Sequence, residues 1–134
     1  MSDAGNSHSD VVSRIEARPR LSDAEKEAWL FHYVKVGATD LLQAYVADGV
    51  QVNRQDESGM TPLHHAVAHG TRPCIRVLVN SGRCDYLIRD NLGRYASDIA
   101  IEWSRDFAVA RLLSKHQARQ AHARGVLPFE TDQR

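Results

Sequence analysis

The sequence predicts an all-α protein in which short helices occur in repeated pairs. Glycines recur with a period of 33 residues, since Gly37 is followed by Gly70, and Gly49 by Gly82. A fixed period of this length indicates a solenoid of stacked units. Apolar residues also align between the two units: Leu41, Leu42, Tyr45 and Val46 in the first match Cys74, Ile75, Leu78 and Val79 in the second.

The first unit begins with a capping-box pattern. Ser22 and Glu25 have the S-x-x-E spacing, in which each side chain bonds the backbone N–H of the other residue. A helix is therefore expected to begin at Ser22 and to end at Gly37, where glycine permits a left-handed conformation.

The middle unit contains a complete turn-helix pattern, DESGMTPLHHA from Asp56 to Ala66. Gly59 permits a tight turn, Thr61 is suited to the N-cap, and Pro62 is suited to the first helical position. Gly70 is suited to ending the helix. One face of this helix is apolar, with Leu63, Ala66 and Val67.

The third unit departs from this pattern. GRYASDIA, from Gly93 to Ala100, replaces the motif, so that Asp98 stands where the middle unit has His64. One extra residue lies between Gly82 and Gly93, which predicts an irregular loop there. A longer final helix is expected from about Asp106 to Ala123, because basic residues enrich its last turns and suit the helix dipole.

With T-P-L-H-x-A at Thr61–Ala66 and a 33-residue period, the chain resembles the ankyrin-repeat family over residues 22–124. The resemblance implies an ankyrin-repeat solenoid of about three helix-turn-helix repeats with short β-hairpin fingers. Its domain would span residues 21–124, with repeats at about 21–55, 56–89 and 90–124. It also implies that the motif residue His64 hydrogen-bonds locally and toward the neighbouring repeat.

The two ends differ in composition from the repeats. Residues 1–20 have little apolar content and are expected to be disordered, although Val11, Val12 and Ile15 could instead form a short helix over the first repeat. Residues 125–134 are expected to be an extended tail, or to fold back on the last helix.

Composition restricts the function class. Seventeen basic residues balance seventeen acidic ones, which argues against nucleic-acid binding. No apolar run is long enough to span a bilayer, and residues 1–20 lack the apolar block of a secretory signal. We therefore expect a cytoplasmic monomer with no nucleic-acid or membrane partner. Arginine outnumbers lysine by fourteen to three, which favours a GC-rich, bacterial source.

The histidines and cysteines do not indicate a metal or catalytic site. His65 and His69 share a helix face, but zinc needs three or four ligands. Cys74 and Cys84 hold repeat positions that suggest burial, so both are expected to act as small apolar fillers. No Gly-rich phosphate loop or nucleophile elbow is present. We expect no cofactor and no enzymatic activity.

The resemblance implies a concave surface, lined by finger tips and the exposed ends of the first helices, that grips a partner protein. Aligning Gly70 with Ser104 places Trp103 at the position of His69, and tryptophan is a frequent interface hot spot. The alternative is that Trp103 packs against the last helix near Phe107. Met60 and Leu92 are expected to be exposed apolar contacts. The candidate partner-binding residues are Lys35, Glu57, Ser58, Met60, His65, Ala68, His69, Asn91, Leu92, Arg94, Glu102 and Trp103.

The predicted function is protein–protein interaction through this concave surface. An alternative is a regulatory or inhibitory subunit, or a secreted bacterial effector, that acts on a specific enzyme. The sequence does not separate these alternatives, because one surface chemistry serves all of them.

Overall fold

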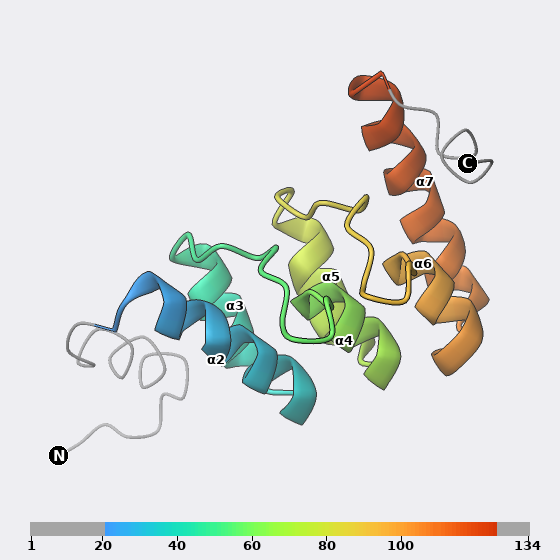
Figure 1. Cartoon of the computed structure of the whole chain (residues 1–134). Coiled ribbons are helices and arrows are strands. Elements are labelled where there is room, and N and C mark those ends of the chain that lie inside the picture. Colours follow the sequence, from blue (N-terminus) through green and yellow to red (C-terminus); the bar gives the residue numbers. More distant parts are fainter. Residues whose placement is uncertain (1–20, 126–134) are drawn as a thin grey trace, which may run out of the picture.

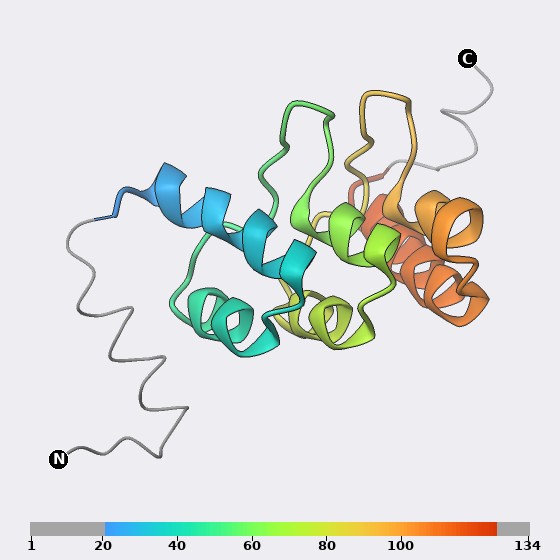
Figure 2. The same cartoon turned by 90° about the horizontal axis from the view of Figure 1, so that it is seen from below.

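The computed structural model describes residues 21–125, which form two layers of helices. Figure 1 shows the helix pairs side by side, and Figure 2 shows both layers with two finger loops projecting beside the first layer. The first layer contains α2 (Asp23–Val36), α4 (Pro62–His69), α6 (Ala96–Ile99) and the π-helical turn η1 (Ala100–Ser104). The second layer contains α3 (Thr39–Ala47), α5 (Arg72–Asn80) and α7 (Phe107–Ala123).

The predicted all-α repeat fold is confirmed, and the predicted helix boundaries recur in it. Ser22 and Glu25 form the reciprocal capping box, and Thr61 caps α4. Gly70 is left-handed, with φ 68°, and Asp106 caps α7 through the backbone N–H of Val109. The expectations for the N-terminal segment and the C-terminal tail concern residues 1–20 and 126–134, which lie outside the described residues.

The core runs between the two layers and along the stack of repeats. Apolar side chains from every helix pair enter it, and the most deeply buried are Leu30, Leu42, Tyr45, Leu78, Ile99 and Leu113. The thiols of Cys74 and Cys84 are also buried, which confirms their expected place as apolar fillers.

The fingers contain no β-strand within residues 21–125, so the expectation of β-hairpins is not met. Each finger tip is a tight turn instead. The N–H of Asp56 donates to the carbonyl of Met60 at 2.9 Å, and that of Asp90 donates to Arg94 at 3.0 Å. The second tip therefore repeats the first, and the prediction of an irregular loop was wrong at the tip. The extra residue lies earlier, between Gly82 and Asp90.

A second extra residue lies at the end of the third repeat's first helix. In the middle repeat, the N–H of Thr71 donates to the carbonyl of Ala66 at 3.1 Å, five residues back. In the third repeat, the N–H of Asp106 donates to Ala100 at 2.9 Å, six residues back. The turn η1 accommodates the added residue by widening to π-helical geometry, as π-bulges do.

This insertion changes the alignment of the third repeat. The left-handed residue that corresponds to Gly70 is Arg105, with φ 53°, and not the residue before it. Counted back from Arg105, Trp103 corresponds to Ala68, whereas counted forward from Ala100, the equivalent of Ala66, it corresponds to His69. The predicted pairing of Gly70 with Ser104 was one residue out of register, because it assumed an unbroken α-helix.

The loop segment of residues 83–86 is held by two amide side chains, those of Asn53 and Gln120. Asn53 accepts from one N–H of the segment at 2.8 Å and donates to one carbonyl at 2.9 Å. Gln120 of α7 makes the same pair of bonds on the other side, both at 2.7 Å. The alternating backbone groups belong to Arg83 and Asp85 for Asn53, and to Cys84 and Tyr86 for Gln120.

Candidate protein-interaction surface

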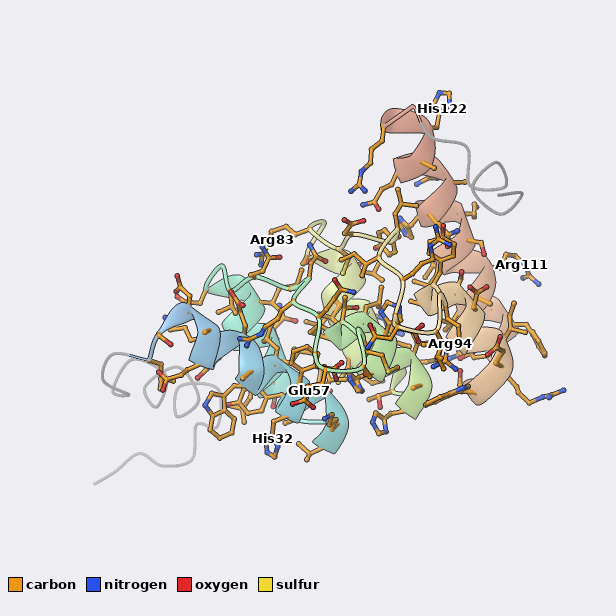
Figure 3. All side chains as sticks on the ribbon, in the orientation of Figure 1. His32, Glu57, Arg83, Arg94, Arg111 and His122 are labelled. Carbon is orange, nitrogen blue, oxygen red and sulfur yellow. The ribbon has the colours of Figure 1, made fainter. Side chains whose placement is uncertain are left out.

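We use the name finger face for the surface made by finger tips 56–60 and 90–94 with the adjoining sides of α2, α4 and η1. Both fingers project on the same side of the first helix layer (Figure 2). Glu57 and Arg94 belong to the first and second finger respectively (Figure 3). The concave surface that the resemblance implied was expected to consist of the same elements, the finger tips and the exposed ends of the first helices.

The first finger is built around the carboxylate of Asp56. It accepts hydrogen bonds from the N–H and hydroxyl of Ser58 at 2.9 and 2.7 Å, and from the N–H of Met60 at 3.0 Å. His65 of α4 donates to the other oxygen at 2.7 Å. Burial acts to raise the pKa of Asp56, but the hydrogen bonds from Ser58, His65 and Met60 outweigh it and lower this pKa to about 2.

His65 connects the first finger to α2. Its ring meets the edge of Phe31 with 5.6 Å between centroids and stacks on His69 at 6.4 Å. The side chain of His65 is only 13% exposed. It therefore orients the finger, while His69 is the exposed member of the pair.

The second finger is built around Asp90. Its carboxylate accepts from the N–H of Leu92 at 3.0 Å, and from the N–H and Nε of Arg94, each at 2.9 Å. Burial acts to raise the pKa of Asp90, but the bonds from Arg94 and Leu92 lower it overall. Arg94 takes the place that His65 holds at the first finger.

Trp103 lies against the second finger. The Arg94 guanidinium sits over the indole with 5.0 Å between Cζ and the ring centroid, and Arg94 also approaches Glu102 at 3.7 Å. The indole is 53% exposed. This position favours a surface contact over packing against the last helix near Phe107.

The two fingers are joined at their tips by Asn91. Its N–H donates to the carbonyl of Ser58 at 2.9 Å, and its side-chain amide donates to the carbonyl of Glu57 at 2.8 Å. Gly59 is left-handed, with φ 80°, and a Cβ there would lie 2.5 Å from Oδ1 of Asn91. Only glycine allows this approach.

His64 makes both bonds that the resemblance implied. Its Nδ1 accepts from the N–H and hydroxyl of Thr61 at 3.3 and 2.8 Å, and its Nε2–H donates to the carbonyl of Arg94 at 3.1 Å. It thereby connects α4 to the second finger. Burial lowers the pKa of His64 below its usual value.

The candidate partner-binding residues differ in their exposure. Leu92 is 78% exposed at the second tip, and His65, Ala68 and Arg94 are partly covered. The exposed candidates are Lys35, Glu57, Ser58, His69, Asn91, Leu92, Glu102 and Trp103.

Met60 does not lie on this surface. It is 5% exposed and belongs to the hydrophobic core, so the expectation of an exposed contact was wrong. The chain has already turned back at Gly59, and the residue that follows leads into α4 with its side chain directed inward.

The sequence reasoning missed the two carboxylates that organise the fingers. Asp56 and Asp90 open the pentapeptides DESGM and DNLGR, which share aspartate at the first place and glycine at the fourth. This D-x-x-G pattern predicts a turn in which the aspartate side chain accepts hydrogen bonds from the backbone N–H groups that follow it. Phe31, on which His65 packs, was also missed.

Residues 21–125 contain no group of three or more His, Cys, Asp or Glu side chains that could hold a metal ion. Among the same residues, no helix combines the length and apolar character needed to cross a bilayer.

The chain resembles several curated proteins. It is 34% identical over 86 residues to the probable 26S proteasome regulatory subunit p28 of Saccharomyces cerevisiae, covering 63% of this chain and 38% of that protein. An ankyrin repeat-containing protein of Schizosaccharomyces pombe is 39% identical over 57 residues, which is 42% of this chain and 27% of that protein. Mouse protein phosphatase 1 regulatory subunit 12A is 36% identical over 66 residues, 49% of this chain and 6% of its own.

The chain thus spans well under half the length of each of these relatives. The family model for ankyrin repeats in three copies matches residues 30–123. This match covers α3 to α7 and the second half of α2, with both fingers. The chain belongs to the ankyrin-repeat family, whose domains are protein-interaction modules.

Proposed function

We propose that the finger face binds a partner protein. The observation that carries the proposal is Trp103, a large aromatic side chain that stays 53% exposed while Arg94 holds it beside a finger. Exposed tryptophan at a rigid site is typical of interface hot spots.

The surroundings of Trp103 suit an interface. Leu92 adds a second exposed apolar side chain from the finger tip, and charged residues such as Lys35, Glu57 and Glu102 lie exposed around the face. An apolar centre with a polar rim is the usual anatomy of a protein interface.

The test begins with a partner identified by affinity capture with the full chain, followed by measurement of its Kd with purified proteins. Trp103→Ala combined with His69→Ala is expected to weaken binding about a hundredfold, because hot-spot truncations cost roughly 2–4 kcal/mol. Arg111→Ala is the matched control, since Arg111 projects from α7 away from the fingers (Figure 3). Unchanged affinity in a folded double variant would contradict the proposal.

A regulatory subunit is the second candidate. Two of the similar proteins are named as regulatory subunits, one of the proteasome and one of protein phosphatase 1. If this chain regulates an enzyme, adding it to the captured partner will change that enzyme's kcat or KM, and the Trp103 and His69 substitutions will abolish the change. Binding without any effect on the partner's activity would leave an adaptor role instead.

A further inference from the structure

The balanced charge of the chain conceals a strong segregation within the fold. Neither α5 nor α7 contains Asp or Glu, whereas their sequences RPCIRVLVN and FAVARLLSKHQARQAHA contain five Lys and Arg residues. Asp106, the α7 N-cap, is already paired with Arg72 through two bonds of 2.8 Å. Within residues 21–125 no ion pair joins Arg76, Lys115 or Arg119 to a carboxylate.

An open groove of about 720 Å³ lies between α5 and α7. Its floor is apolar, and Leu112 at its edge is 42% exposed. Two arginines, Arg72 and Arg76, form its charged rim, and Arg72 is the one already paired with Asp106. The groove is lined by the apolar residues Ile75, Val79, Ala108, Val109 and Leu112, together with Arg72, Arg76, Asn80 and His116.

The groove between α3 and α5 differs in charge and in use. It measures about 430 Å³, and the guanidinium of Arg83 is committed there, donating to the carbonyls of Val46 at 2.6 Å and Val50 at 3.0 Å. That arginine therefore binds the C-terminal end of α3 and the loop that follows it. In the described part of the chain, residues 21–125, Arg76 makes no such hydrogen bond or ion pair, which leaves its charge available to a ligand.

His116 of α7 lies close to the positive charges of this helix. Its ring stacks on Tyr86 with 4.9 Å between centroids. Burial lowers the pKa of His116, and the charges of Arg119 and Lys115 lower it further. Arg119 and Lys115 therefore disfavour a further positive charge near His116, and the same two cations attract a negatively charged ligand.

We propose that the α5–α7 groove binds an acidic, amphipathic peptide segment of a partner protein. Apolar side chains of that segment pack on Leu112 and the floor, and its carboxylates face Arg76 and the neighbouring cations. This surface belongs to the second helix layer, so it is separate from the finger face and extends the proposed function. The apolar floor distinguishes the ligand from a nucleic acid, whose phosphates would use only the rim.

The test uses the full chain and a fluorescent peptide with Leu and Glu at helical spacing, in which Glu→Gln and Leu→Ser versions are controls. Fluorescence anisotropy is expected to show saturable binding of the acidic amphipathic peptide only. Arg76→Glu and Leu112→Gln should each weaken it about tenfold or more. Arg111→Glu is the matched control, because it changes the net charge equally on a residue of α7 that does not line the groove.

Three results would overturn the proposal. One is the absence of saturable binding by the acidic peptide, with circular dichroism showing that the protein is folded. Another is an equal loss with Arg111→Glu, which would mean attraction to bulk charge. The third is tighter binding of a single-stranded oligonucleotide or of phosphatidylserine vesicles with the same Arg76 dependence, which would assign the groove to a nucleic acid or a membrane surface.

Discussion

The guanidinium of Arg94 lies over the indole of Trp103, with 5.0 Å between Cζ and the ring centroid. Arg94 also binds the carboxylate of Asp90 through Nε at 2.9 Å. Arg94 therefore contacts the buried carboxylate of Asp90 on one side and the exposed ring of Trp103 on the other. These contacts connect the second finger to η1. The position of the most prominent surface residue depends on this arginine.

Arg94→Gln is expected to lower the free energy of unfolding by about 2 kcal/mol, because it leaves the buried carboxylate of Asp90 without its charged partner. It should also free the Trp103 ring. Acrylamide quenching in a Trp29→Phe background reports this ring alone, and quenching should increase. Glu102→Gln is the control, since its exposed contact with Arg94 at 3.7 Å is worth little. Equal quenching in both variants would contradict the arrangement.

Arg105→Gly is expected to stabilise the protein by about 1 kcal/mol, because a non-glycine residue at φ 53° bears a steric cost that glycine avoids. Ser104→Gly should have the opposite sign, since Ser104 lies within η1, where glycine costs about 1 kcal/mol of backbone entropy. The urea unfolding midpoints of the two variants show which residue is the left-handed one. The simple 34-residue alignment assigns it to Ser104 and so predicts stabilisation by Ser104→Gly, which would contradict the structure.

Stability should fall as the pH drops below about 6.5. Burial lowers the pKa of His64, and burial with nearby cations lowers that of His116. The unfolded chain therefore binds protons that the folded chain does not, and acidification favours unfolding. Urea unfolding at about pH 7.5 and 5.5 measures the slope. The double variant His64→Gln, His116→Gln should flatten it, and an unchanged slope would contradict the assignment.

Asp56 determines how stability depends on pH in a separate, more acidic range. Its pKa of about 2 lies below the ordinary 3.8, so its carboxylate contributes about 2 kcal/mol of stability above the unfolded pKa. This contribution is lost as the pH falls from about 3.8 through about 2. Asp56→Asn should lower stability at neutral pH and lose less on acidification over that range. Thermal unfolding at both ends of the range provides the measurement.

Burial raises the pKa of Cys84 to about 12, and its thiol donates to the carbonyl of Leu78 at 3.2 Å. The thiolate needed for alkylation is therefore nearly absent at pH 8. Iodoacetamide should leave Cys84 unlabelled in the folded protein and label it fully in urea. Peptide mass spectrometry separates it from Cys74, and rapid native labelling of Cys84 would disprove the buried position.

The elements that could be predicted are those specified by local chemistry. The capping box at Ser22 and the run from Thr61 to Pro62 state where helices begin, because caps and proline act within one turn. Asp106 as the start of α7 follows from the same logic. These positions required no knowledge of which repeat packs against which.

The misplaced residues depend on geometry beyond one turn. Met60 was taken as exposed because it belongs to a finger, yet the return of the chain at Gly59 directs it into the core. Ser104 was aligned with Gly70 because a π-helical insertion leaves no mark in the residue types. The groove between α5 and α7 could not be predicted because it forms only when two helices distant in the sequence pack side by side. Its cations were also overlooked, because the net charge of the whole chain is zero.

The close approach of Gly59 to Asn91 has a thermodynamic consequence for recognition. Asn91 donates two hydrogen bonds to the first finger, and its close approach leaves no room for a side chain at Gly59. The two finger tips are therefore held together as one rigid unit. Loops that must be ordered on association lose conformational entropy, which subtracts from affinity. Here that ordering is complete before any partner arrives, so even a surface of few contact residues can retain most of the free energy of its contacts as binding affinity.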